Sequence, residues 1–235
     1  MQIIVLSITN YKEKDVIISA LSENGYRSFL LKGALAIKSR HAFLTNPLMI
    51  ADISIMEGNY KFPIIKEAKE ITSPLKINYD YYYLSAINLL VEITKKMTND
   101  EEKNQLFYLL KDAIEALKNE INPYFICLTY LANILKLTGY NMEIDACVNC
   151  GNKRQIKDFS FQSGGFICTN CQTNENTIYS VKQLKLIRTI FKNKDFKIID
   201  LDLNKSDYQL VLNGFYEFIL EAYGIKLNSL NMLLK

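Results

Sequence analysis

Residues 147–171, CVNCGNKRQIKDFSFQSGGFICTNC, contain four of the chain's five cysteines, in two Cys-x-x-Cys pairs separated by 17 residues. This pattern is typical of a site in which four thiolates bind one zinc ion. Each pair forms a tight turn that directs two sulfurs at one point, and the residues between them suffice for a hairpin. Gly151, Gly164 and Gly165 supply backbone freedom at these turns. The predicted ligands are Cys147, Cys150, Cys168 and Cys171.

Three other uses of the four cysteines stay open at this point. Two disulfides would need an oxidising compartment, whereas the opening MQIIVLSITN has neither the basic start nor the cleavage pattern of a signal peptide. A redox Cys-x-x-Cys would not need a second pair. An iron–sulfur cluster also accepts four cysteines, but nothing in the sequence indicates an electron acceptor. Because four thiolates close the coordination shell of zinc, we expect a structural site and no catalysis at the metal.

The first 70 or so residues are predicted to form strands. Five short runs are rich in β-branched or aromatic residues, and SENG and EGN mark turns between neighbours. The runs cover residues 2–9, 15–22, 26–35, 48–56 and 61–71. Five strands in so short a segment favour a small closed barrel, because closure removes the exposed edges of an open sheet.

After residue 78 the spacing of apolar residues changes from two to about 3.6, which predicts amphipathic helices. The first three cover residues 80–98, 101–119 and 122–139. Asn122 and Pro123 suit the first positions of the third helix. SVKQ and SDYQ match the Ser-x-x-Gln capping box, so two further helices are expected to start near Val181 and Asp207, the second ending at Gly224.

The sequence therefore predicts an α+β protein in three parts. Residues 1–78 form the five-stranded barrel, residues 79–146 together with 179–235 form a helical domain, and residues 147–178 form an inserted zinc module. No apolar run reaches the length of roughly 20 residues that spans a bilayer. We expect a soluble, cytoplasmic protein that does not bind membranes.

Basic residues gather in the predicted barrel although the net charge of the chain is only +3. The stretch between residues 27 and 51 contains four of them and no acid, and two more lie in the preceding turn. The candidates for contact with a phosphate backbone are Arg27, Lys32, Lys38, Arg40, Lys12 and Lys14. An ordinary solvated surface accounts for the same residues equally well.

A second basic set lies on one side of the helix expected after the cysteines. It consists of Lys182, Lys185, Arg188 and Lys192, which recur every three to four residues. Its charge is only suggestive of a nucleic-acid contact. Cys127 falls on an apolar helix face and is expected to be a buried free thiol.

The sequence contains few residues or motifs that would support an enzymatic activity. His41 is the only histidine, so no histidine-based triad or multi-histidine metal site can be assembled. Neither GxxxxGK[ST] nor GxGxxG is present to hold a nucleotide. We therefore expect no enzymatic activity and no small-molecule substrate.

The order and spacing of several segments resemble the RecO family of bacterial DNA-repair proteins over essentially the full chain. Near the N-terminus they are YKEKDVIISALSENG (11–25) and KGALAIKSRHAFLTNPL (32–48). FICLTYLANILKLTGYNMEIDACVNCG (125–151) and GGFICTNC (164–171) contain the cysteine pairs, and AYGIKLNSLNML (222–233) ends the match. Each segment is weak alone, and their order together is specific.

The resemblance implies an N-terminal OB barrel, a helical domain and a structural zinc module. It also implies a non-enzymatic recombination mediator that binds single- and double-stranded DNA and anneals strands coated by single-strand-binding protein. Such a protein works with RecR to help load RecA. Lys32, Lys38 and Arg40 match the family's basic segment, which is associated with DNA contact, and the four cysteines match its zinc pairs.

The chain departs from the family pattern at three positions. Lys12 stands where the family often has glycine, and Leu35 and Ala36 replace arginines of the basic segment. These replacements thin the basic patch, so the strength of DNA binding is not fixed by the resemblance. A rival hypothesis is a zinc-stabilised protein–protein adaptor whose basic residues are merely solvated.

Overall fold

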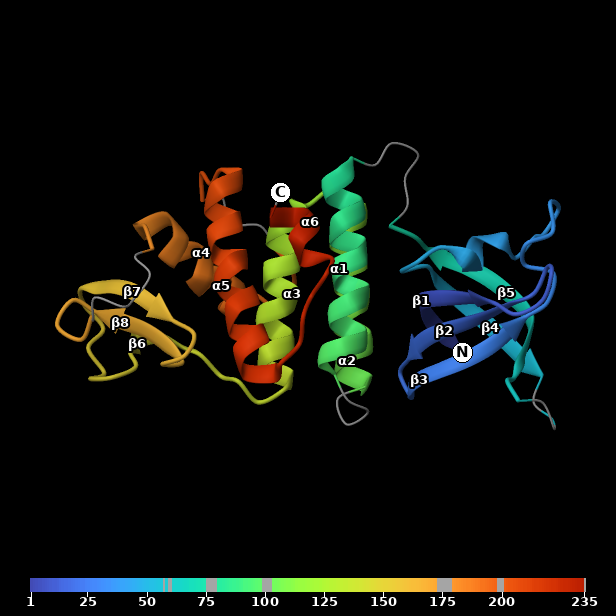
Figure 1. Cartoon of the computed structure of the whole chain (residues 1–235), viewed down its shortest axis with the longest axis horizontal. Coiled ribbons are helices and arrows are strands. Elements are labelled where there is room, and N and C mark those ends of the chain that lie inside the picture. The colour runs from blue at the N-terminus through green and yellow to red at the C-terminus, as the bar shows by residue number, and fades with distance from the viewer. Residues whose placement is uncertain are drawn as a thin grey trace. The chain divides into compact units, whose positions relative to one another are not determined.

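The computed structural model describes residues 1–56, 58, 61–74, 80–98, 103–172, 179–197 and 201–234. The chain divides into two compact units, an N-terminal unit (Met1–Glu120) and a C-terminal unit (Ile121–Lys235). Figure 1 follows the strands and helices of both units along the chain.

The N-terminal unit opens with a closed five-stranded barrel, as predicted. Its strands are β1 (Gln2–Asn10), β2 (Val16–Ser22), β3 (Gly25–Leu31), β4 (Ile50–Met56) and β5 (Ile64–Thr72). They are hydrogen-bonded in the order β1-β2-β3-β5-β4, and β4 closes back on β1. All neighbours are antiparallel except β3 and β5, which run parallel where Leu30 meets Ile64. This is the OB-fold expected from the family resemblance.

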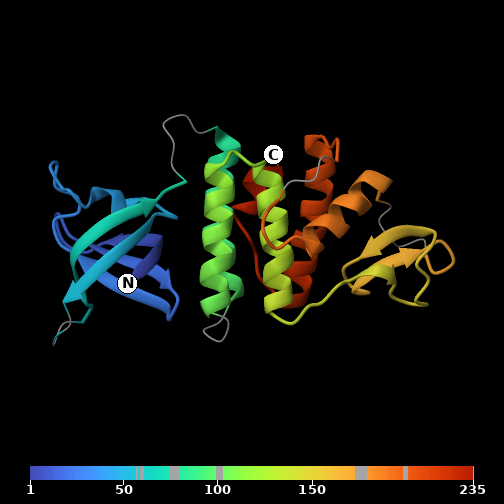
Figure 2. The same ribbon diagram turned by 180° about the vertical axis from the view of Figure 1, so that it is seen from behind.

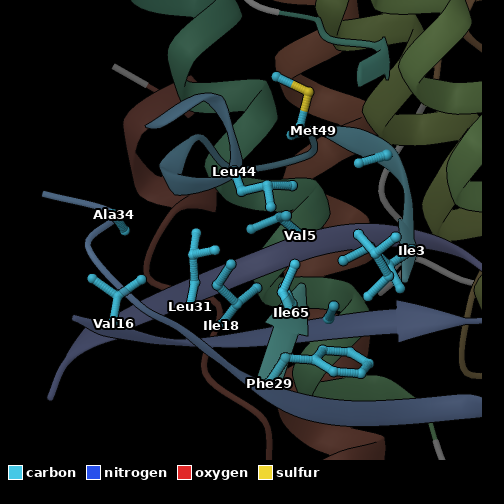
Figure 3. Packing of buried hydrophobic residues seen from close by; sticks show 13 residues of the cluster. Ile3, Val5, Val16, Ile18, Phe29, Leu31, Ala34, Leu44, Met49 and Ile65 are labelled. Carbon is cyan, nitrogen blue, oxygen red and sulfur yellow. The ribbon is translucent and has the colours of Figure 1, made fainter. Parts of the chain in front are cut away.

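The barrel interior is filled by alternate residues of the strands, as the two-residue period requires. Ile3 and Val5 of β1, for example, point into a cluster with Phe29 of β3, and all three are fully buried. Figure 3 shows the connection between β3 and β4 contributing to the same cluster through Ala34 and Leu44. This connection, which includes the short 3₁₀ helix η1 (Ala42–Thr45), is therefore anchored in the core.

Two helices complete the N-terminal unit, namely α1 (Tyr81–Met97) and α2 (Lys103–Lys118). Ile4 of β1 and Leu21 of β2 pair with one another and are fully buried, although they belong to the outer face of the barrel. α2 contacts β2 and β3, and the hydroxyl of Tyr108 donates to the Glu23 carboxylate at 2.7 Å. The helices and the barrel thus share one compact unit.

The C-terminal unit is built around α3 (Pro123–Leu137), whose residues from Tyr124 to Leu135 are all buried. It is surrounded by α4 (Val181–Lys192) and α5 (Lys205–Tyr223), and α6 (Leu230–Leu234) packs on α5. Figure 2, seen from behind, shows α3 and α5 side by side. The Asn122 cap of α3 and the Ser180 capping box of α4 are confirmed.

The start of α5 differs from the prediction. The helix begins at Lys205, capped by Asn204, whose side chain accepts from the Asp207 N–H while Asp207 accepts from the Asn204 N–H. Ser206 therefore lies inside the first turn and is not the cap. The predicted end is confirmed, since Gly224 has a left-handed conformation with φ of 66°.

The cysteines lie on a small sheet that packs on the helices of the C-terminal unit. Its strands β6 (Glu143–Cys147), β7 (Ile156–Ser160) and β8 (Gly165–Cys168) are ordered β6-β8-β7. Phe159 of β7 lies against Phe191 of α4, with ring centroids 6.0 Å apart, and Phe161 in the turn after β7 lies against Phe215 of α5, at 4.7 Å. Within the described residues, no helix is both long enough and apolar enough to cross a membrane.

Candidate metal centre and nucleic-acid interface

Two tight turns hold the four cysteines. In the first, the Gly151 N–H donates to the Cys147 carbonyl at 2.8 Å, and Gly151 has a φ of 72°. In the second, the Cys171 N–H donates to the Cys168 carbonyl at 3.0 Å. The strands β6 and β8 bring these turns together because the first turn leaves the end of β6 and the second leaves the end of β8.

All four sulfurs lie within 4.8 Å of one another, and the sulfurs of Cys150 and Cys168 are 3.6 Å apart. A tetrahedral zinc ion with bonds of about 2.3 Å separates its sulfurs by about 3.8 Å. The cysteines are free thiols, so the arrangement does not arise from disulfides. The residues present therefore fit a four-coordinate metal ion, and the four cysteines could hold one.

The ionisation of the thiols also fits a bound cation. Burial raises the pKa of Cys147, but hydrogen bonds from the backbone N–H groups of Cys168, Asn149 and Cys150 outweigh it and lower the pKa to about 6. The pKa of Cys171 is raised to about 12, because its protonated thiol is stabilised by hydrogen bonds to the sulfurs of Cys150 and Cys168 and because its thiolate is desolvated. Four adjacent thiols cannot all ionise without a neutralising charge, which a dication supplies.

The strands β6 and β8, which lead into the two cysteine turns, pack closely against each other at Gly165. A Cβ atom on Gly165 would lie 2.4 Å from the carbonyl oxygen of Glu143, so only glycine allows β8 to approach β6 this closely. Gly165 therefore has a packing role in addition to the flexibility that the sequence suggested.

The structure brings together most of the predicted basic residues of the barrel. The Leu35 N–H donates to the Lys14 carbonyl at 3.1 Å, and the Gly33 N–H donates to the Asp15 carboxylate at 2.8 Å. These bonds fix the β1–β2 turn (residues 11–15) against the connection after β3, here called the 32–40 loop. The side chains exposed on the two segments include Lys12, Lys14, Lys32, Lys38 and Arg40.

Arg27 lies apart from this group. It is near the start of β3, whereas Lys32 directly follows the end of that strand. Its guanidinium group is 5.6 Å from the ring centroid of Phe29. Arg27 is thus five residues along a strand from the loop, at the opposite end of the barrel wall.

Three of the four cations of the second basic set on α4 form ion pairs with acids. Arg188 and Lys192 both contact the Asp145 carboxylate of β6, at 2.5 and 2.6 Å, and Lys182 contacts Asp202 at 2.6 Å. The hydrogen bonds from Lys192 and Arg188 lower the pKa of the Asp145 carboxyl group, and the bond from Lys192 has the larger effect. The helical spacing gave no sign of Asp145, because that residue is distant in sequence and close only in the fold.

The 32–40 loop also exposes apolar side chains that its charge pattern did not single out. Ile37 is fully exposed and Leu35 is 44% exposed, although Ala34 beside them is buried. Contiguous exposed apolar patches can mark contact with another molecule, whereas single exposed apolar side chains are common. Only the folded loop shows which of its apolar residues turn outward.

Comparison with known proteins covers nearly the whole chain. Residues 1–74 match the family model for the N-terminal part of recombination protein O, and residues 78–231 match the model for its C-terminal part. The DNA repair protein RecO of Mesoplasma florum is 26% identical over 99% of this chain and 89% of its own length.

Two further relatives carry the same name. The DNA repair protein RecO of a Thermoanaerobacter species is 30% identical over 77% of this chain and 73% of its own length. That of Bacillus cereus is 26% identical over 96% of this chain and 92% of its own length. With both family models matched in order, the chain belongs to the RecO family of DNA repair proteins.

Proposed function

We propose that this protein is a DNA-binding recombination mediator without an active site. It binds single- and double-stranded DNA through the phosphate backbone, anneals complementary strands and, with RecR, helps to load RecA onto strands coated by single-strand-binding protein. Membership of a family of DNA repair proteins supports a role in DNA repair, and we place this role in the cytoplasm as part of the proposal. Backbone contact carries little sequence preference, which suits a protein that must act on any damaged site.

The observation that carries the proposal is the joining of two basic segments on the barrel. Hydrogen bonds attach the β1–β2 turn to the 32–40 loop, so that lysines distant in sequence share one surface. Successive turns fold the loop, since the Ala36 N–H donates to Gly33 and the Ser39 N–H to Ala36. A loop fixed in this way loses less conformational entropy when it binds a strand. The proposed contacts are Lys12, Lys14, Lys32, Lys38 and Arg40, with Arg27 as a separate outlying cation.

We further propose that the metal is zinc and that its role is structural. Four cysteine thiolates form a closed shell, leaving no position for a water or a substrate. The three parts expected from the sequence then divide the work. Residues 1–78 hold DNA, residues 79–146 with 179–235 receive protein partners, and residues 147–178 form the zinc module.

Titration with a labelled oligonucleotide over a salt series tests the DNA contact. The logarithm of the binding constant should fall with the logarithm of salt concentration, by about 0.9 per phosphate contacted on duplex DNA. Reversing Lys32, Lys38 and Arg40 to glutamate should weaken binding to all sequences alike. The matched control reverses Lys61, Lys66 and Lys69, which are exposed on or beside β5 of the same barrel. Equal losses in both variants, or affinity that barely changes with salt, would contradict the proposal.

Annealing separates a mediator from a passive DNA binder. Two complementary strands with a fluorophore and a quencher should pair faster in the presence of the wild-type chain, also when both are coated with single-strand-binding protein. The triple variant of the 32–40 loop should lose this acceleration. Binding without any acceleration would reduce the proposal to a DNA-binding protein.

A protein–protein adaptor is the second candidate, and the exposed Ile37 favours it. An apolar side chain that is entirely exposed within a folded loop suits docking on a partner protein. Replacing Ile37 by serine keeps every charge of the loop. If this variant binds DNA normally and loses capture of RecR, the loop also serves a protein partner. If the wild-type chain captures partners but does not shift DNA, the adaptor replaces the mediator.

A further inference from the structure

The cysteine module (residues 147–172) carries exposed charge of only one sign. Lys153, Arg154 and Lys157 are exposed, and none of them forms an ion pair with a described residue. The one acid within residues 147–172 is Asp158, which is fully buried. Among the described residues 147–172 no exposed acid accompanies these three cations, and only the buried Asp158 carboxyl senses the charge of Lys157.

Hydrogen bonds to both cysteine turns hold the segment with these cations, here called the 152–157 loop. The Cys147 N–H donates to the Asn152 carbonyl at 2.8 Å, and the Arg154 N–H donates to the Asn152 side chain at 2.9 Å. Gln155 has a φ of 55°, an uncommon conformation for a residue with a side chain. Its carbonyl accepts from both the N–H and the hydroxyl of Thr169, which follows Cys168.

The surroundings of the loop suit sugar and phosphate more than a peptide. Asn149, Thr169 and Asn170 are exposed at the tips of the cysteine turns and offer amide and hydroxyl groups. The phenylalanines of the module, in contrast, are buried against the helices. The described part of the module therefore offers no exposed phenylalanine or tyrosine ring on which a base could stack. Polar and cationic groups of this kind make backbone contacts that are independent of sequence.

We propose that the 152–157 loop is a second nucleic-acid contact of this protein, one that binds phosphates of single- or double-stranded DNA. The inference rests on the proposed function and extends it to a site on the other compact unit. Two separate phosphate contacts allow one chain to hold two strands at once, which favours annealing. The metal centre then has a purpose beyond stability, because its two turns hold the loop in place.

Two alternative roles for the cations of the 152–157 loop predict different results. Four thiolates and a dication carry a net charge of about −2, which nearby cations stabilise. In that case the cations should matter for zinc retention and not for DNA. Lys157 lies on the edge strand β7, where a lysine also protects against pairing with other chains. Lys157 is therefore left unchanged in the test variants.

The test compares Lys153→Glu/Arg154→Glu with a control of equal charge change, Lys194→Glu/Lys197→Glu, whose residues are exposed just after α4. Zinc content and the number of protected thiols are measured first, and both variants should retain the wild-type values. Affinity for a labelled duplex, followed by fluorescence anisotropy, should fall about tenfold in the loop variant, and the salt dependence should lose a slope of about 2. The control should remain within about twofold of wild type.

Neutral Lys153→Gln/Arg154→Gln keeps the proposal testable if charge reversal disturbs the fold, and should lower affinity about threefold. Wild-type DNA affinity in the loop variants, with or without a loss of zinc, would overturn the inference. So would an equal loss in the control, or binding of an acidic peptide by the loop with no effect on DNA. If reversal of the 32–40 loop alone abolishes binding, only this inference fails. If the wild-type chain binds no DNA, the proposed function fails as well.

Discussion

Asp158 shows how a buried charge can matter to the stability of the cysteine module. One carboxylate oxygen accepts from the N–H groups of Phe159 and Tyr179, at 2.9 and 3.3 Å. The other oxygen has no hydrogen-bond partner among the described residues. Burial raises the pKa of Asp158 above its ordinary value, despite these two bonds and the nearby charge of Lys157.

The direction of this shift gives a prediction for Asp158→Asn. An acid whose pKa is higher in the folded state holds its proton more tightly there, so its contribution to stability falls as pH rises from about 4 through the folded pKa. Asparagine keeps an acceptor for the two N–H groups and removes the charge. Urea unfolding should show that the stability of the variant relative to wild type grows between pH 4 and pH 7.

Asp158→Ala is the comparison that separates charge from hydrogen bonding. It removes the acceptor as well as the charge, and should destabilise the protein by about 1–3 kcal/mol at pH 7. If the asparagine and alanine variants are destabilised equally at pH 7, the prediction is wrong, and the charge of the Asp158 carboxylate is stabilised by a partner in the folded protein.

Cys127 should be chemically silent, unlike the other four cysteines. Its side chain is fully buried in α3, and burial raises the pKa of the thiol, so the reactive thiolate does not form near neutral pH. With a thiol reagent, the zinc-bound protein should show almost no reaction, four thiols after a chelator, and five after a denaturant. A fifth thiol that reacts in the folded, chelated protein would contradict this assignment.

Residues that must recur at a fixed spacing, such as the paired cysteines, can be predicted from the sequence. Residues whose role depends on a neighbour distant in the sequence cannot. The cysteine pairs can be recognised because a metal demands their spacing. Gly165 is needed for its approach to Glu143, and Asp145 for its pairing with Arg188, and neither relation has a signature along the chain.

The first turn of α5 is an element-scale case in which two caps compete. The sequence offers Ser206 with Gln209 as well as Asn204 with Asp207, and the structure uses the second pair. The Asn204 side chain accepts a hydrogen bond from the N–H of the third helical residue, Asp207. The Asp207 carboxylate accepts from the Asn204 N–H in return. Asp207 also lies in the first turn of the helix, where a negative charge is favourable. Gln209 instead donates to the Leu233 carbonyl of α6.

Asn204→Ala should therefore cost about 1 kcal/mol of stability, the usual value for a lost N-cap. Ser206→Ala is the matched control, because its hydroxyl only donates to the Asn204 side chain, at 2.6 Å, and it should cost distinctly less. Thermal unfolding of the two variants checks the order. A larger loss at Ser206 would place the cap where the sequence alone suggested.

For the whole molecule, the grouping of the helices depends on contacts between segments that are distant in the sequence. Periodicity correctly gave the existence and near-correct limits of α1 and α2, but cannot say which partner buries them. Both helices belong to the same compact unit as the barrel. The outer face of the barrel around Ile4 and Leu21 is apolar and is buried in this unit. Burial of both faces of a strand is a tertiary property, which a two-residue alternation does not reveal.

The division into compact units predicts that removal of the proposed zinc ion has a local effect. The barrel has its own core, and the cysteine module rests on α4 and α5 through Phe159 and Phe161. Without the metal the two cysteine turns lose the ion that joins them, whereas the aromatic contacts keep the module attached. A chelator should therefore speed hydrogen exchange in residues 143–155 and 165–171 and leave β1–β5 unchanged.

Chelation also tests whether the metal centre contributes to DNA affinity. Because the Cys147 and Thr169 backbones hold the 152–157 loop, chelation should lower duplex affinity to about that of Lys153→Glu/Arg154→Glu, and should have no further effect on that variant. The contact of the 32–40 loop should persist, since its hydrogen bonds lie entirely within the barrel. Global unfolding on chelation would contradict the independence of the two cores. An unchanged exchange rate around the cysteines would show that the turns need no metal.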